Sequence, residues 1–301
     1  MNKIAKQILC AILLAVMLIS VVACASQEMP SSQSDTSDGA SADNSGEVSE
    51  DPNAKYLDEE GRYVTKLGVL DEYKAVIIAD PQQPFSESDK YILDQYVMQG
   101  GRILWVVNGV RFSEDYLSSQ GATPIIALEL NINDLLFRYG VRINHALVQD
   151  LQCLPVPVDV SINSSEPNWQ PMPWTYAPLL LTSQASSITR NVAQVSATMA
   201  SAIDLVGGED GLRKEVLLAT STASKLTATP ARVDLNWGVD NETSFQYAFI
   251  PVAVCIEGSF PSLYAYQLPP EEITTQNPLL KQSKATKQIV VAAGSAIRNE
   301  W

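Results

Sequence analysis

The chain has 301 residues, a formal net charge of −14 at pH 7 and an apolar fraction of 46%. That apolar fraction suits a globular protein with a proper core. The negative charge argues against a nucleic-acid-binding protein, because phosphate recognition needs a basic face. Much of the charge lies between Glu28 and Glu60, where ten acids stand against one base, Lys55. The acidity therefore characterises this segment more than the rest of the chain.

The first 23 residues have the composition of an export signal. Lys3 and Lys6 give a positive start, residues 8–22 are almost entirely apolar, and small and branched residues precede Cys24. This is the pattern that lipoprotein signal peptidase cleaves before a lipid-bearing cysteine. An ordinary membrane helix is the alternative, but the run is short for the roughly 20 residues that a span needs. We therefore predict a lipoprotein signal peptide at 1–23 and a lipid on Cys24, which would hold the chain on the extracytoplasmic face of the cell membrane.

Residues 24–60 are rich in Ser, Asp, Glu, Gly, Ala and Asn and contain few apolar side chains. Such a segment buries too little apolar area to offset the entropy lost on ordering. The sequence predicts an acidic, disordered tether here, followed by a folded domain over residues 61–301.

The folded part opens with a strand, a helix and a second strand. Residues 75–79 form a short apolar run, as expected of a strand buried on both faces. Ser86 and Asp89 have the spacing of a capping box, and Gly100 provides a helix stop. Residues 102–107 give the next buried strand. A βαβ unit with short loops predicts an α/β fold with a mostly parallel sheet.

The elements that follow are shorter or less regular. A helix is expected from Asn131 or Asn133 through Tyr139, and a strand over 146–148. Residues 154–178 are rich in Pro and Trp, which predicts irregular or edge structure because proline cannot donate to a sheet ladder. Further strands are expected at Val216–Ala219, Tyr247–Ile256, Ser262–Tyr266 and Gln288–Ala292.

Enzyme signatures are absent from the sequence. A single histidine, His145, rules out multi-histidine zinc sites, and neither a P-loop nor a nucleophile elbow occurs. The glycine-rich stretch 207–211 indicates a turn rather than a phosphate site. Cys153 and Cys255 stand in apolar surroundings, which favours free thiols over a disulfide. We expect no cofactor, no metal and no catalytic residue.

Four side chains are candidates for a ligand or partner face. Asp80 and Asp150 follow predicted strands, and ligands of open parallel sheets bind beyond the carboxyl ends of strands. The two acids would then share one crevice, although acids are also common where strands turn into loops. Trp169 and Trp174 suit an exposed contact surface, because tryptophan is enriched at interfaces. The alternative is that these tryptophans cover the edge of the sheet.

Stretches along most of the folded part resemble the GldG family, the gliding-motility-associated auxiliary or substrate-binding component of ABC transporters. They occur in the family's order at residues 76–81, 84–86, 90–95, 100–105, 130–131, 134–144, 147–153, 174–180, 257–260 and 297–299. The resemblance implies a Rossmann-like domain related to the glutamine-amidotransferase fold, without its chemistry. It also implies permease and ATPase subunits as partners, and supplies no catalytic residue.

The chain departs from the family in three places. A lipoprotein leader and tether stand where members usually begin with a membrane helix and a further extracytoplasmic region. The chain ends at Trp301, before the family's second membrane helix, so the domain looks truncated at its C-terminus. Ala293 precedes Gly294 where the family commonly has an acid.

Three functions follow as hypotheses. The first is a non-enzymatic, lipid-anchored accessory or substrate-binding component of an export- or gliding-type ABC transporter. The second is a free-standing lipoprotein that binds a solute or glycan. The third, ranked last because fold does not imply function, is a hydrolase or amidotransferase that uses Cys153.

Overall fold

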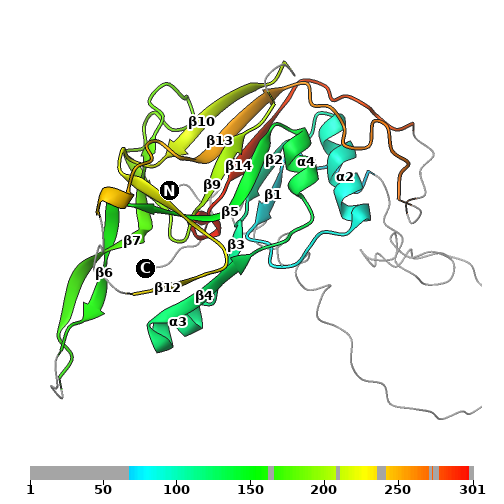
Figure 1. The fold of residues 1–301 in the computed structure, drawn as a ribbon. Helices are drawn as coiled ribbons and strands as arrows, with labels where there is room; N and C mark the ends of the chain where they lie inside the picture. The colour runs from blue at the N-terminus through cyan, green and yellow to red at the C-terminus, as the bar shows by residue number, and fades with distance from the viewer. Residues whose placement is uncertain are drawn as a thin grey trace, which may run out of the picture. The chain divides into compact units, whose positions relative to one another are not determined.

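The computed structural model describes residues 68–161, 166–207, 211–235, 242–270, 273 and 278–297 (Figure 1). The predicted signal peptide, Cys24 and the tether lie outside these residues. The elements are β1 (Val76–Ala79), α2 (Glu87–Met98), β2 (Ile103–Val106), β3 (Val110–Arg111), α3 (Glu114–Gln120), β4 (Ala122–Ala127), α4 (Asn133–Arg138), β5 (Val141–Asp150), β6 (Cys153–Asp159), β7 (Trp169–Thr182), β8 (Gln194–Ser196), β9 (Ser201–Leu205), β10 (Arg213–Ala219), β11 (Ser224–Ala228), β12 (Ala231–Asp234), η2 (Glu242–Ser244), β13 (Pro251–Gly258), β14 (Thr286–Val291) and η3 (Gly294–Ile297).

The main sheet has eight strands in the order β1-β2-β14-β13-β10-β7-β6, with β8 paired to β7. Only the pairs β1–β2 and β2–β14 are parallel, and the other pairs in this sheet are antiparallel. Two three-stranded antiparallel sheets, β11-β5-β9 and β12-β4-β3, complete the strands. The prediction of a Rossmann-like, mostly parallel α/β fold is therefore wrong, because one parallel βαβ unit is extended by antiparallel strands.

The βαβ unit itself is confirmed. Ser86 caps α2 by accepting a hydrogen bond from the amide of Asp89, and the Asp89 carboxylate accepts one from the amide of Ser86 in return. Gly100 follows the helix with a φ of 103°, which a glycine adopts without strain. The strands β1 and β2 then pair in parallel, from Val76 opposite Ile103 onward.

Strand β13 divides the apolar interior between the two faces of the main sheet. Val254 and Ile256 join the largest cluster, together with side chains of α2, α4, β2 and β5. Ala253 and Cys255 point the other way, into a second cluster with β7 and β10. This alternation is the period of two that a strand buried on both faces requires.

Much of the Pro- and Trp-rich segment forms the antiparallel strand pair β6–β7, with one register irregularity between Cys153 and Pro155. Strand β6 lies at the sheet edge, so of the two alternatives predicted for this segment, edge structure is confirmed. Pro155 stands opposite Pro173, and Pro157 opposite Pro171. Two prolines that face each other need no N–H in the ladder, because they occupy the non-hydrogen-bonded pairs of the register. The prolines are therefore compatible with a strand pair, although a proline-rich sequence usually argues against strands.

Other predicted elements shift. The helix at Asn133–Arg138 is confirmed, and the strand expected at 146–148 extends to Val141–Asp150. The strand expected from Tyr247 begins only at Pro251, because Phe249 has a φ of 54° and breaks the extended backbone. Residues 262–266 form turns rather than a strand. The strands expected near 216–219 and 288–292 are confirmed as parts of β10 and β14.

No helix in the part of the chain that the structure describes is both long and apolar enough to cross a membrane.

Candidate functional site

The carboxyl ends of the three parallel strands meet in one polar junction. Asp80 follows β1, Asn108 follows β2, and Gly294 lies just after β14. The Asn108 amide donates to the Asp80 carboxylate at 2.8 Å, and its oxygen accepts the Gly294 N–H at 2.7 Å. The Gln82 side chain adds a second donor to the Asp80 carboxylate, at 3.1 Å. The position of Asp80 thus agrees with the rule that placed it beyond a strand end.

The Asp80 and Asn108 side chains lie so close to the backbone of Gly294 that only glycine fits at this position. A Cβ on Gly294 would collide with the Asp80 carboxylate and the Asn108 amide. Asp80 itself has a φ of 46°, a left-handed conformation that aspartate tolerates better than most residues. The three residues therefore hold one another in a fixed arrangement.

A small polar pocket of about 250 Å³ opens beside the junction. Gln82 and Asn108 line it together with Arg111, Glu114 and Asp115. The Arg111 guanidinium donates to the carbonyl of Gln82 at 2.6 Å. In the described residues, no group of three or more His, Cys, Asp or Glu side chains is arranged to hold a metal ion. The pocket offers hydrogen bonds to a small polar group.

Asp150 lies elsewhere, at the end of β5 in a different sheet, so the shared crevice predicted for it and Asp80 does not form. Its carboxylate is fully buried and accepts hydrogen bonds from the amide and hydroxyl of Ser221, both at 2.6 Å. The Ser224 hydroxyl and the Gln152 amide donate to it as well. These contacts tie the end of β5 to the turn between β10 and β11.

The two tryptophans occupy opposite environments. Trp174 is buried, and its indole N–H donates to the carbonyl of Asp234 at 3.0 Å. Its ring lies 5.9 Å from that of Tyr176 between centroids, so it belongs to the core. Trp169 lies at the start of β7 and is 62% exposed. Of the pair, only Trp169 has a side chain exposed to solvent.

The remaining reactive side chains have structural surroundings. Cys153 and Cys255 are free thiols. Burial, and then the nearby Asp150 charge, raise the pKa of Cys153, whereas a nucleophilic cysteine needs a lowered pKa. His145 lies in β5, with Nδ1 2.7 Å from the carbonyl oxygen of Gly109.

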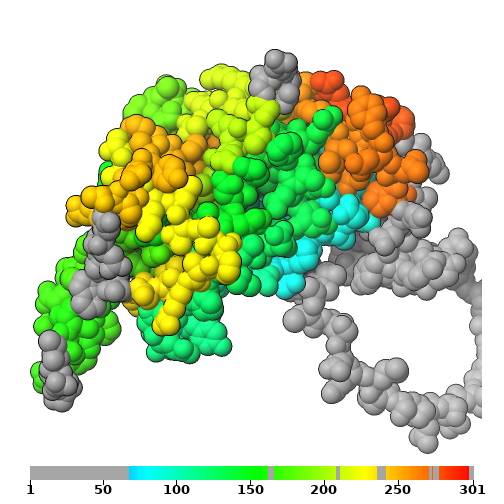
Figure 2. All heavy atoms as spheres, in the orientation of Figure 1, coloured from blue at the N-terminus to red at the C-terminus, as the bar shows by residue number. Residues whose placement is uncertain are grey.

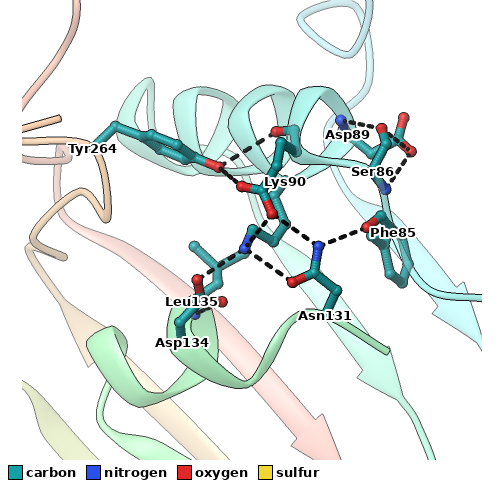
Figure 3. A network of polar contacts seen from close by, with 9 residues as sticks. Phe85, Ser86, Asp89, Lys90, Asn131, Asp134, Leu135 and Tyr264 are labelled. Carbon is teal, nitrogen blue, oxygen red and sulfur yellow. Dashed lines mark hydrogen bonds and ion pairs between the residues drawn. The ribbon is translucent and has the colours of Figure 1, made fainter. Parts of the chain in front are cut away.

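A buried lysine on α2, which the sequence analysis did not single out, organises a second polar cluster (Figure 3). Lys90 is 2% exposed, and its Nζ lies 2.8 Å from the Asp134 carboxylate and 3.1 Å from that of Glu87. The Asn131 amide donates to Glu87 and to the carbonyl of Phe85, each at 2.9 Å. The cluster fastens α2 to the start of α4. The i, i+3 spacing of Glu87 and Lys90 is a weak sequence signal, because most such pairs are exposed.

A larger groove, of about 540 Å³, runs beside α4 and β5. Its lining includes the exposed ring of Phe137, together with Ile143 and the charged side chains of Asp134 and Arg142. Arg142 is paired with Asp204. The groove thus combines apolar surface with charges that already have partners, which suits contact with another protein more than capture of an ion.

Comparison with known proteins identifies the chain at the level of a family. No curated protein matches it significantly. Among solved structures, it is similar to the mmIFT52 N-terminal domain, with 15% sequence identity and a TM-score of 0.38 over 75% of this chain and 68% of that one. The model of the family described as ABC-type uncharacterized transport system matches residues 32–301. The chain therefore belongs to this family and is an auxiliary component of an ABC-type transport system.

Proposed function

We propose that this chain is a lipid-anchored, extracytoplasmic accessory or substrate-binding subunit that acts on an export- or gliding-type ABC transporter by contact and without catalysis. The observation that carries the proposal is the family match over residues 32–301. The predicted leader and Cys24 support the anchor and its side of the membrane. The permease and the ATPase are the proposed partners.

The chemistry of the described residues supports a role by contact. Asp80, the acidic group at the parallel strand ends, accepts hydrogen bonds from Asn108 and Gln82, which hold its carboxylate in place. The raised pKa of Cys153 leaves it protonated, which disfavours the amidotransferase hypothesis. Asp150 and Trp174 are buried, so Asp80 and Trp169 remain as candidate contacts. They belong to strands near opposite ends of the main sheet, so we propose Trp169 as the partner contact and Asp80 as part of a separate polar site.

The test is co-purification of the full chain from solubilised, crosslinked membranes, with mass spectrometry of the captured proteins. We expect a permease or an ATPase in the eluate. Trp169→Ala should reduce its yield several-fold, whereas Tyr116→Ala, which removes a comparably exposed ring on α3, should not. Repeated capture of neither subunit under crosslinking would refute the proposal.

A further inference from the structure

Two large apolar side chains stand almost fully in solvent on the segment between β13 and β14. Tyr266 is 91% exposed and Leu268 is 89% exposed. In the described part of the chain, no other large apolar side chain exceeds the 62% of Trp169. Neighbouring exposed apolar groups of this kind mark a contact surface more often than chance.

The turn that carries them is fixed to the core. The Ser262 hydroxyl and the Leu263 amide donate to the buried Asp94 carboxylate, at 2.6 and 3.0 Å. The Tyr264 ring is buried and packs edge-on against Tyr91, with 5.0 Å between centroids. The amide of Gln267 then donates to the carbonyl of Tyr264 at 3.1 Å. Tyr266 and Leu268 are therefore presented by an anchored turn.

The described chain begins beside this turn. Val69 and Leu70 pack against the apolar cluster that contains Tyr91 and Tyr264, together with Leu263. In Figure 2 the orange atoms of the segment between β13 and β14 adjoin the cyan atoms of the first described elements. The first described residues thus lie on the same side of the fold as the turn that carries the two exposed apolar side chains.

The chemistry of the turn fits one kind of surface. The Lys281 ammonium lies 5.6 Å from the centroid of the Tyr266 ring, so a cation, a phenol and an aliphatic group gather at one place. Tyrosine and lysine favour the headgroup region of a bilayer, and leucine favours its acyl boundary. We propose that the turn 262–268 is a second membrane contact, with Tyr266 and Leu268 inserted into the interface of the bilayer that carries the lipid anchor. This proposal rests on the anchored location proposed above.

The test places a fluorophore at the tip of the turn. The full, lipidated chain carrying Leu268→Cys is labelled with an environment-sensitive dye and reconstituted into phosphatidylethanolamine–phosphatidylglycerol vesicles that contain a lipid-linked nitroxide quencher. Phe249→Cys, at an exposed site before β13, is the matched control. The unsubstituted chain, treated in the same way, reports any labelling of Cys153 and Cys255.

We expect the label at position 268 to be quenched several-fold more than the label at position 249. Equal or absent quenching in chains that float with the vesicles would overturn the second contact while leaving the anchor intact. Chains that do not float would overturn both proposals. Shielding of position 268 only when a permease is co-reconstituted, without quenching by lipid, would assign the turn to a protein partner and overturn the membrane contact.

Discussion

At the scale of single residues, Asp94 joins three parts of the fold through one buried carboxylate. It accepts hydrogen bonds from the hydroxyls of Tyr139 and Ser262, from the amide of Leu263 and from the side chain of Gln95. Burial nevertheless raises the pKa of this carboxyl, since these donors only partly replace the water it loses. The role of the Asp94 carboxylate is therefore to accept the hydrogen bonds of these buried donors.

Asp94→Ala should lower the free energy of unfolding by about 3 kcal/mol, because several buried donors lose their acceptor together. Asp94→Asn should cost less, since its carbonyl can still accept from Tyr139 and Leu263 and the Ser262 hydroxyl can rotate to accept from its amide. Urea unfolding measures both variants, with Glu72→Ala, at an exposed position, as the control. Equal losses for the alanine and asparagine variants would contradict this expectation, because asparagine keeps the shape and one acceptor oxygen; they would show that the fold needs both carboxylate oxygens.

The Lys90 cluster predicts a dependence of stability on pH. The hydrogen bond from Asn131, and then the contact with Lys90, lower the pKa of Glu87 below its usual 4.5. A depressed pKa in the folded state contributes stability above the unfolded value, and this contribution is lost as the pH falls through the folded value. The raised pKa of Asp94 has the opposite effect on how stability changes with pH, so variants are needed to separate the two contributions.

Glu87→Gln should therefore destabilise the protein near pH 7 and should flatten the loss of stability below about pH 4.5. The measurement is the melting temperature of wild type and variant from pH 3 to pH 7. The difference between the two should shrink as the solution becomes more acidic. A constant difference across this range would contradict the assignment of the pH dependence to Glu87.

At the scale of elements, the parts that the sequence predicts well are those specified locally. Strand β1, helix α2 and strand β2 follow from an apolar run, a capping box and a glycine stop, all within about 30 residues. The strand predicted at residues 262–266 does not form, and the reason is a contact with a residue far away in the sequence. Asp94, 168 residues away in sequence from Ser262, accepts a hydrogen bond from the Ser262 hydroxyl and another from the Leu263 backbone amide, which a strand would have used in its ladder.

The capping box of α2 gives a prediction at this scale. Ser86→Ala should cost about 1 kcal/mol, because the Asp89 amide loses its acceptor at the helix start. Asp89→Ala should cost a similar amount, and the double variant less than the sum, since either change breaks the reciprocal pair. Chemical unfolding of the three variants provides the cycle. Strict additivity would mean that the two hydrogen bonds act independently.

At the scale of the whole molecule, the antiparallel majority of the main sheet could not be predicted from the sequence. Its pairs, such as β10 with β13 and β7 with β10, join segments separated by tens of residues and follow no short motif. The same limit applies to the candidate site. Strand-end chemistry located Asp80, but only the paired sheets show that Asp150 is buried in a different layer.

The attachment of the whole molecule to a membrane gives the last prediction. If Cys24 carries the lipid, the mature chain should have a mass that corresponds to cleavage before this residue plus a diacylglyceryl group, and it should partition with membranes. Cys24→Ala should lose the added mass, because the thiol is the atom that forms the thioether. Cys10→Ala is the matched control, since that cysteine lies in the predicted leader and should leave the product unchanged. An unmodified, uncleaved wild-type chain would instead mean that residues 8–22 remain attached as an apolar segment. The membrane contact of the protein would then have to be explained by that segment, not by a lipid.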